Sequence, residues 1–330
     1  MTADLPPSHW LDHLVAFTSG RRRLFKRGWG DEGVLDRLAT VACFEHPPGR
    51  VSVAWDSPQI KGAIVVQEGS FTSPVEELPA EARRAVVRRL LPAGAREAPL
   101  FVVLGASGEE GFGMRTRLFR PMVERAGIGV VLLENAMYGL RRPVGQQGAA
   151  IRTLSEQLLM NIAMVEEARA LFDALSEEGH TRLGITGYSM GGSMAALVAA
   201  VTPRPLAAAV FAAGRSAGPV FTEGLLSTGL DFEALGVGHG GVEGAKERLR
   251  AIFGAADLER HPRPRCASAV VLVAGRRDGY VFTREVEALH ALWGESELRW
   301  VDSGHAGTLL FHGEALRRAA VDAMGRLSSS

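Results

Sequence analysis

From residue 99 onward, short apolar runs alternate with longer segments in which apolar residues recur every three to four positions. Short apolar runs are typical of strands buried on both faces of a sheet, and the longer repeat is typical of amphipathic helices. The predicted strands cover residues 99–107, 128–135, 182–187, 205–214, 268–275 and 297–304. The predicted helices cover residues 114–126 (with Pro121 expected as an interruption), 149–178, 190–201, 283–293 and 306–325. This alternation predicts βαβ units and an α/β fold with a mostly parallel central sheet flanked by helices.

Two parts of the chain depart from that alternation. Residues 1 to about 60 form a mixed N-terminal extension with a possible strand around 51–55. After it, 62–71 is predicted to be a strand and 81–91 an amphipathic helix. Residues 215–262 are rich in glycine, lack a clear period and lie between two predicted strands. We interpret them as a lid or cap insertion within a single domain of residues 1–330.

Composition narrows the class of protein. The 330 residues are 46% hydrophobic. The 37 basic residues balance the 37 acidic ones, and a net charge of zero does not favour nucleic acid as a partner. The two cysteines, Cys43 and Cys266, are too few for a disulfide framework and are expected to be buried thiols. The N-terminus lacks the basic and apolar regions of a signal peptide, and no apolar run is long enough to span a membrane. We therefore expect a cytoplasmic protein.

A serine between two glycines occurs twice, as GYSMG around Ser189 and as GRSAG around Ser216. In a nucleophile elbow, a strand turns sharply into a helix, and the positions two before and two after the serine must be small. Ser189 follows a predicted strand and precedes an uninterrupted apolar helix. Ser216 is followed by proline and glycine, which are poor helix formers. The context favours Ser189 as a nucleophile.

A serine nucleophile needs a base, here a histidine, and an acid that orients the base. In a chain with a nucleophile elbow, the acid follows the serine and the histidine follows the acid. Asp278 lies three residues after a strong predicted strand, and His305 lies between the last strand and the last helix. Asp302 is an alternative acid in the loop of His305, and Asp278 could be a turn aspartate. His312, seven residues after His305, is interpreted as structural.

Two backbone N–H groups should bind the oxyanion of the reaction. Met190 follows the nucleophile at a helix N-terminus, where unpaired donors favour negative charge. Ser107, in the glycine-rich loop after the first core strand, is the second candidate, although Gly105 and Gly108 could simply form a turn. The pattern implies neither a metal nor an organic cofactor.

Several stretches in the same order resemble the α/β-hydrolase domain-containing protein 18 family. They are FKRGWG (25–30), GSFTSP (69–74), RPM (120–122), LLEN with YGLRRP (132–143), TGYSMGGSMA (186–195) and VFTEGLLS (220–227). The resemblance implies an α/β-hydrolase fold with Ser189, Asp278 and His305 at the triad positions. It also implies ester or acyl hydrolysis, with a lipid acyl ester as a plausible substrate class.

The sequence thus predicts a serine hydrolase that cleaves a carboxylic ester. Two alternatives stay open, acyl transfer by the same triad and a catalytically silent binding protein. The insertion is expected to overhang the site, with Phe221, Leu225, Leu226 and Leu230 as candidate wall residues. The basic cluster at 21–27 is either a solvated segment or a contact with anionic lipid headgroups.

Overall fold

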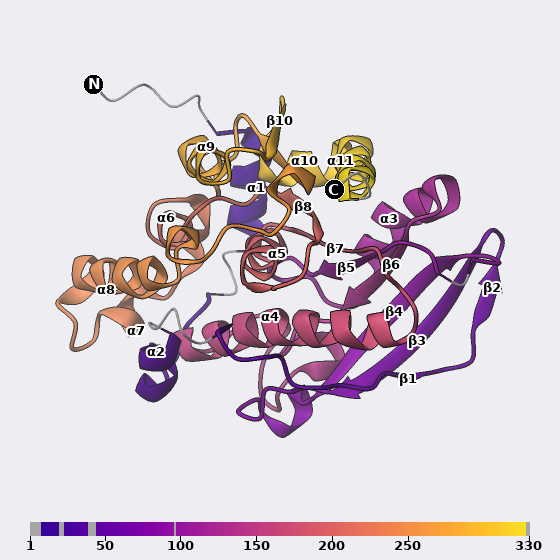
Figure 1. Cartoon of the computed structure of the whole chain (residues 1–330). Helices are drawn as coiled ribbons and strands as arrows, with labels where there is room; N and C mark the ends of the chain where they lie inside the picture. The colour runs from indigo at the N-terminus through magenta and orange to yellow at the C-terminus, as the bar shows by residue number, and fades with distance from the viewer. Residues whose placement is uncertain (1–7, 20–22, 39–43, 96, 328–330) are drawn as a thin grey trace.

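The computed structural model describes residues 8–19, 23–38, 44–95 and 97–327. Ten strands form one sheet in the order β1-β3-β4-β6-β5-β7-β8-β9-β10, with β2 paired to β3 (Figure 1). The strands are β1 (Ala54–Trp55), β2 (Gln59–Lys61), β3 (Ile64–Thr72), β4 (Arg84–Pro92), β5 (Leu100–Leu104), β6 (Gly129–Leu133), β7 (Leu183–Tyr188), β8 (Ala207–Phe211), β9 (Val270–Gly275) and β10 (Glu297–Val301). From β6 to β10 all neighbours are parallel, which confirms the predicted mostly parallel sheet.

Helices cover both faces of the sheet. Within the described residues they are α1 (Trp10–Ser19), α2 (Glu32–Leu38), α3 (Gly113–Ala126), α4 (Leu154–Glu177), α5 (Met190–Val201), α6 (Gly218–Thr222), α7 (Phe232–Gly236), α8 (Gly241–Ala255), α9 (Thr283–Leu292), α10 (His305–Phe311) and α11 (Gly313–Leu327). Helices α4 and α5 pack on one face, and α3 and α11 pack on the other, each with its own apolar core (Figure 1).

The helix predicted at residues 81–91 is wrong, because this segment contains β4, which pairs antiparallel with β3 and β6. Ala85 and Val87 pack in the core on one face of the sheet, while Val86 and Leu90 pack in the core on the other. A strand buried on both faces shows no polar–apolar alternation, so its apolar spacing can imitate a helical period.

Two other helix predictions need correction. Helix α3 runs without interruption through Pro121, which removes only one backbone hydrogen bond. The predicted helix at 306–325 is two helices, α10 and α11, which are separated at His312. The first of them begins at His305 itself, so the break leaves a short helix whose N-terminus lies beside the candidate site.

The insertion, residues 215–262, contains the helices α6, α7 and α8, which its glycine content had hidden. In α8, Ala245, Leu249 and Phe253 are buried at a spacing of four residues and join the core on the α4 and α5 face. The insertion therefore folds against the domain and shares its core.

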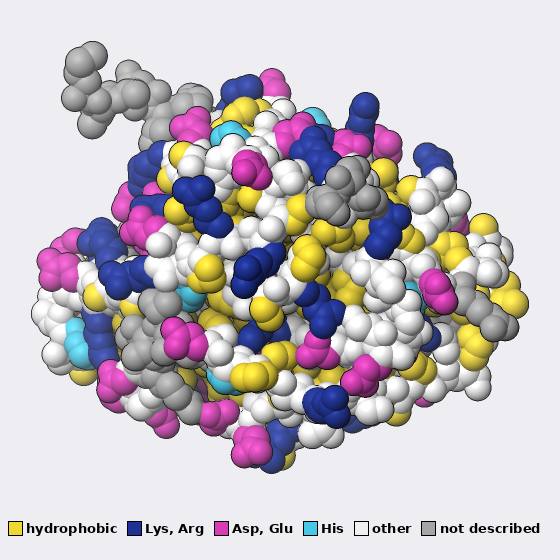
Figure 2. Space-filling view, viewed as in Figure 1, with side chains coloured by type: hydrophobic (Ala, Val, Ile, Leu, Met, Phe, Trp, Pro, Cys, Tyr) yellow, Lys and Arg dark blue, Asp and Glu magenta, His cyan; other side chains and the backbone are white. Residues whose placement is uncertain are grey.

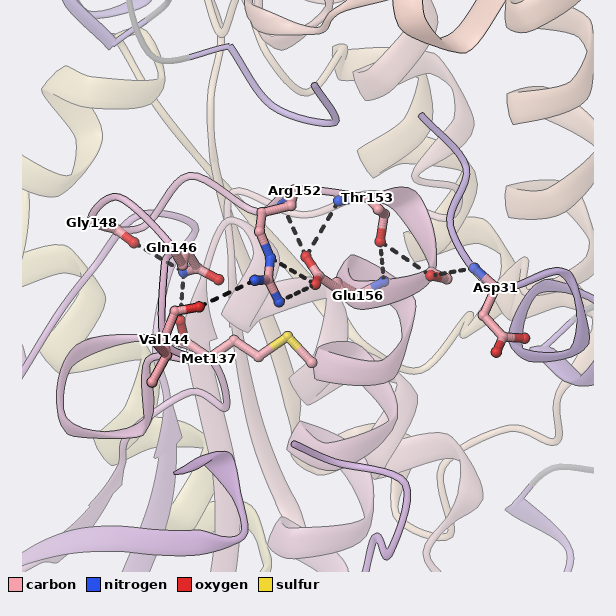
Figure 3. A network of polar contacts seen from close by, with 9 residues as sticks. Asp31, Met137, Val144, Gln146, Gly148, Arg152, Thr153 and Glu156 are labelled. Carbon is pink, nitrogen blue, oxygen red and sulfur yellow. Dashed lines mark hydrogen bonds and ion pairs between the residues drawn. The ribbon is translucent and has the colours of Figure 1, made fainter. Parts of the chain in front are cut away.

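A polar network fixes the segment that leads into α4 (Figure 3). Thr153 and Glu156 form a capping box, which starts the helix at residue 154 and not at 149 as predicted. Arg152 pairs with Glu156 at 2.8 Å, and the Gln146 side-chain amide donates to the carbonyl oxygen of Met137 at 2.7 Å. The contacts hold the loop whose residues Ala149 and Ala150 line the pocket described below.

Candidate active site

Ser189 lies at the turn from β7 into α5 and has a left-handed backbone, with φ 57° and ψ −121°. A Cβ atom on Gly187 would lie 2.3 Å from the carbonyl carbon of Gly191, and a Cβ atom on Gly191 would lie 2.5 Å from the carbonyl oxygen of Leu104. Neither position therefore accepts a larger residue without a shift. The strained backbone of Ser189 persists only where the surrounding structure enforces it. Here the Ser189 N–H donates to the carbonyl oxygen of Phe211 at 2.9 Å, which helps to hold the turn. This is the turn that the sequence predicted around Ser189.

A chain of hydrogen bonds connects the three predicted triad residues. His305 Nε2 lies 2.9 Å from Ser189 Oγ, and His305 Nδ1 lies 2.7 Å from Asp278 Oδ2. The other oxygen of Asp278 accepts the backbone N–H groups of Tyr280 and Val281, both at 2.8 Å, which fixes the carboxylate. The loops after β7, β9 and β10 therefore bring together side chains that are up to 116 residues apart.

The alternative acid lies elsewhere. Asp302 has an 81% exposed side chain and pairs with Arg277 at 3.1 Å. His312 lies at the break between α10 and α11. Ser216 accepts a hydrogen bond from the Gly218 N–H at 3.2 Å, within the insertion. Within the described part of the chain, a histidine contacts Ser189 and Asp278, whereas none contacts Ser216 or Asp302.

Opposing effects set the pKa of His305. Burial lowers it, but the charge and hydrogen bond of Asp278 and the charge of Asp12 outweigh burial and raise it above its ordinary value. The Tyr188 hydroxyl donates to the backbone carbonyl of His305, which also fixes the loop. The imidazole of His305 therefore holds a proton more readily than a free imidazole does.

The candidate oxyanion donors, Met190 and Ser107, come from two different loops at the sheet edge that carries Ser189. Met190 is the first residue of α5, so its N–H has no acceptor within the helix. Ser107 lines the same pocket as Ser189. Among the described residues, none accepts a hydrogen bond from the Met190 or Ser107 amide.

Buried polar side chains hold the Ser107 loop. The Asn135 side-chain amide donates to Gly105 O at 3.1 Å, and Glu109 accepts the Ala106 N–H at 3.2 Å. Glu109 is itself paired with buried Arg115 at 2.9 Å. This support was not predicted from the sequence, because its members lie on different elements.

Asp12 is a further residue of the site that the sequence did not predict. It lies on α1, is fully buried, and accepts three backbone N–H groups. Its Oδ2 accepts Gly279 at 2.9 Å and His305 at 2.8 Å, and its Oδ1 accepts Ala306 at 2.9 Å. Asp12 thereby joins the loop of Asp278 to the loop of His305 and caps α10. A lone carboxylate in the apolar stretch WLDHLVAF is the one signal that could have indicated it.

Ser189 and His305 line a cavity of about 660 Å³, a typical size for a small-molecule site. Its walls come from α1, the insertion, α10, and the loops at 106–109 and 149–150. From the insertion, Leu225 and Leu226 line the cavity as predicted. Phe221 does not, because it stacks on Phe253 at 4.5 Å. Leu230 is also absent from the cavity wall, since it is buried in the core.

The rest of the described chain offers few other functional features. It contains no cluster of His, Cys, Asp and Glu that could hold a metal ion, and no helix long and apolar enough to cross a membrane. Basic and acidic side chains alternate over the face in Figure 2, in keeping with the zero net charge. Cys266 is buried as expected; Cys43, Arg21 and Arg22 lie outside the described residues.

The parallel sheet, the strained serine turn and the order of the three side chains are those of the α/β-hydrolase class. Solved structures support this class. The chain is 14% identical to acetyl xylan esterase 1 from Thermoanaerobacterium, with a TM-score of 0.60 over 93% of this chain and 98% of that one. An acetyl xylan esterase from Paenibacillus is 16% identical, with a TM-score of 0.56 over 96% of each chain. Identities this low show the fold alone.

A family model identifies the particular group. The model for "alpha/beta hydrolase domain containing 18" matches residues 22–240 and 237–326. The chain belongs to this family, as the sequence resemblance indicated. Hydrolase activity of the α/β fold is thereby supported.

Proposed function

We propose that the protein is a serine esterase in which Ser189 is the nucleophile, His305 the general base and Asp278 the orienting acid. The observation that carries the proposal is the continuous hydrogen-bond chain from Ser189 Oγ through the imidazole to the Asp278 carboxylate. This arrangement supplies what a weak hydroxyl nucleophile needs, a base in contact and a group that orients the base.

In the first half of the reaction, Ser189 Oγ attacks the carbonyl carbon of the ester while His305 Nε2 takes the hydroxyl proton. The resulting oxyanion is stabilised by the N–H groups of Met190 and Ser107. Collapse of the tetrahedral intermediate breaks the bond to the alcohol oxygen, which receives the proton from His305. The acyl group is then bound to Ser189.

In the second half, a water molecule gives a proton to His305 and attacks the acyl carbon. Collapse releases the carboxylic acid and returns the proton to Ser189 Oγ. The Asp278 carboxylate stabilises the imidazolium in both halves and fixes the tautomer with its proton on Nδ1.

We infer that the substrate is an ester with an extended apolar acyl group, in line with the lipid acyl ester that the family resemblance implies. Apolar side chains from the insertion and from α1, among them Val15, Ala16, Leu225 and Leu226, support this choice because they line the cavity that holds Ser189. In this proposal the insertion acts as a lid over the acyl site.

The test combines fluorophosphonate labelling with hydrolysis of p-nitrophenyl esters of increasing chain length. Ser189→Ala should abolish labelling and lower turnover by a factor on the order of 10⁶. The matched control is Ser216→Ala, which changes the serine of the second Gly-x-Ser-x-Gly sequence and should leave both unchanged. Persistent labelling of Ser189→Ala would refute the assignment, and product analysis with an added alcohol would reveal acyl transfer.

A further inference from the structure

Helix α1 has a buried face and an exposed apolar face. Asp12 and Ala16 point into the protein, while Trp10 is 67% exposed, Leu14 49% and Phe17 68%. The exposed residues are four and three positions apart, so they lie on one side of the helix. Large apolar side chains exposed together on one face form the kind of contiguous patch that marks a protein or membrane interaction surface.

A neighbouring helix extends this surface. Helix α10 packs against α1, and its Leu310 is 60% exposed and its Phe311 73% exposed. We call Trp10, Leu14, Phe17, Leu310 and Phe311 the apolar rim. The adjacent residues of the same helices, Val15 and Ala16 on α1 and Leu309 on α10, line the cavity that contains Ser189. Apolar surface therefore continues from the rim into the cavity.

Basic side chains follow the apolar helix. Arg23 and Lys26 are exposed, and Leu24 between them lines the same cavity. Helices that bind lipid surfaces combine an apolar face of this kind with nearby Lys and Arg, which attract anionic headgroups.

We propose that the apolar rim, together with Arg23 and Lys26, docks the protein on an anionic lipid surface with the mouth of the cavity facing the lipid. This inference rests on the proposed esterase function, because an acyl ester in the lipid could then reach Ser189 without crossing water. A protein partner on the same surface would cover the entrance that the substrate needs, which favours lipid as the occupant.

The test is sedimentation of the full chain with vesicles of phosphatidylcholine mixed with phosphatidylglycerol, and with vesicles of phosphatidylcholine alone. The wild-type protein should bind the mixed vesicles more tightly, with affinity that falls as salt rises. The variant Trp10→Ser/Leu14→Ser/Phe311→Ser should lose at least about tenfold in vesicle affinity. Arg23→Gln/Lys26→Gln should lose on the order of thirtyfold on mixed vesicles and little on phosphatidylcholine.

The matched control is Ile60→Ser, which removes an equally exposed apolar side chain (77%) from β2 at the opposite end of the sheet and should bind like the wild type. Hydrolysis of a soluble short-chain ester should be unchanged in the rim variant, so failure of docking is separable from failure of the esterase proposal. Three results would overturn the inference: no vesicle binding by the wild type, equal binding by the rim variant, or a dimer that the rim variant dissociates without any vesicle binding.

Discussion

Asp12 offers the sharpest test of how the active site is held together. Its carboxylate accepts the N–H groups of Gly279, His305 and Ala306, at 2.8 to 2.9 Å, and has no exposed surface. All three donors belong to the proposed triad or are adjacent to one of its members. Asp12→Ala removes the common acceptor and leaves three buried donors without it.

The size of the effect follows from those three donors. A buried donor without an acceptor costs about 1–3 kcal/mol, so even the lower end gives a loss on the order of 3 kcal/mol in the free energy of unfolding. For a chain of 330 residues, that loss corresponds to a decrease of roughly 4 °C in Tm. If the loops relax by about 1 Å to find other partners, the misplaced imidazole costs about 100-fold in kcat.

The assay measures kcat, KM and Tm on a soluble p-nitrophenyl ester. Because Asp12 acts through His305 and does not line the cavity, kcat should fall with little change in KM. Asp12→Asn keeps the shape but removes the charge that raises the pKa of His305, so the acid limb of the rate profile should move to lower pH. Asp302→Asn, an exposed carboxylate three residues from His305, is the control and should resemble the wild type. A fully active Asp12→Ala with an unchanged Tm would refute the reasoning.

Three further predictions concern the triad and the cavity. Asp278→Asn should fold normally and lose about 10⁴ in turnover, whereas a large loss in Asp302→Asn instead would reassign the acid. The kcat/KM of the wild type should rise with pH through a midpoint above the ordinary imidazole pKa of about 6.5, because the pKa of His305 is raised and only neutral imidazole accepts the proton. A midpoint below about 6.5 would contradict this prediction. Leu226→Trp should shift the ester preference toward shorter acyl chains, measured on the p-nitrophenyl series with the exposed Val237→Trp as control. An unchanged preference with a lowered Tm would mean that Leu226 contributes to packing and not to substrate selection.

The parallel half of the fold was predictable because its sequence signals are local and consistent. Each parallel strand except β10 is a short apolar run, and the crossover helices repeat their apolar residues at a helical spacing. The carboxyl ends of parallel strands meet at one edge of a sheet, so residues that follow them can be expected to converge. For this reason Ser189, Asp278 and His305 could be assigned to one site from order and spacing alone.

The antiparallel half was less predictable. In β4, apolar residues face both cores, and Arg88 pairs with Glu68 of the neighbouring strand. The four arginines of residues 81–91 suggested the polar face of a helix, since nothing in the segment itself reveals a partner strand about 20 residues away. Helix α8 was not predicted, because its glycines weaken the helical pattern of the sequence. Tertiary packing stabilises the helix in spite of them.

Asp12 lies beyond what such local signals can reveal. Its partners are 267 to 294 residues away, and the contact arises only because α1 packs against the loops after β9 and β10. A carboxylate in an apolar helix is costly to bury unless donors surround it, so its presence predicts a buried partner without identifying one. The same helix carries Trp10, Leu14 and Phe17 of the apolar rim on its other side, with Trp10 and Leu14 each two residues from Asp12. Since positions two apart face different directions on a helix, substitutions on the rim should change lipid binding and leave the pH profile unmoved, whereas Asp12→Asn should do the reverse.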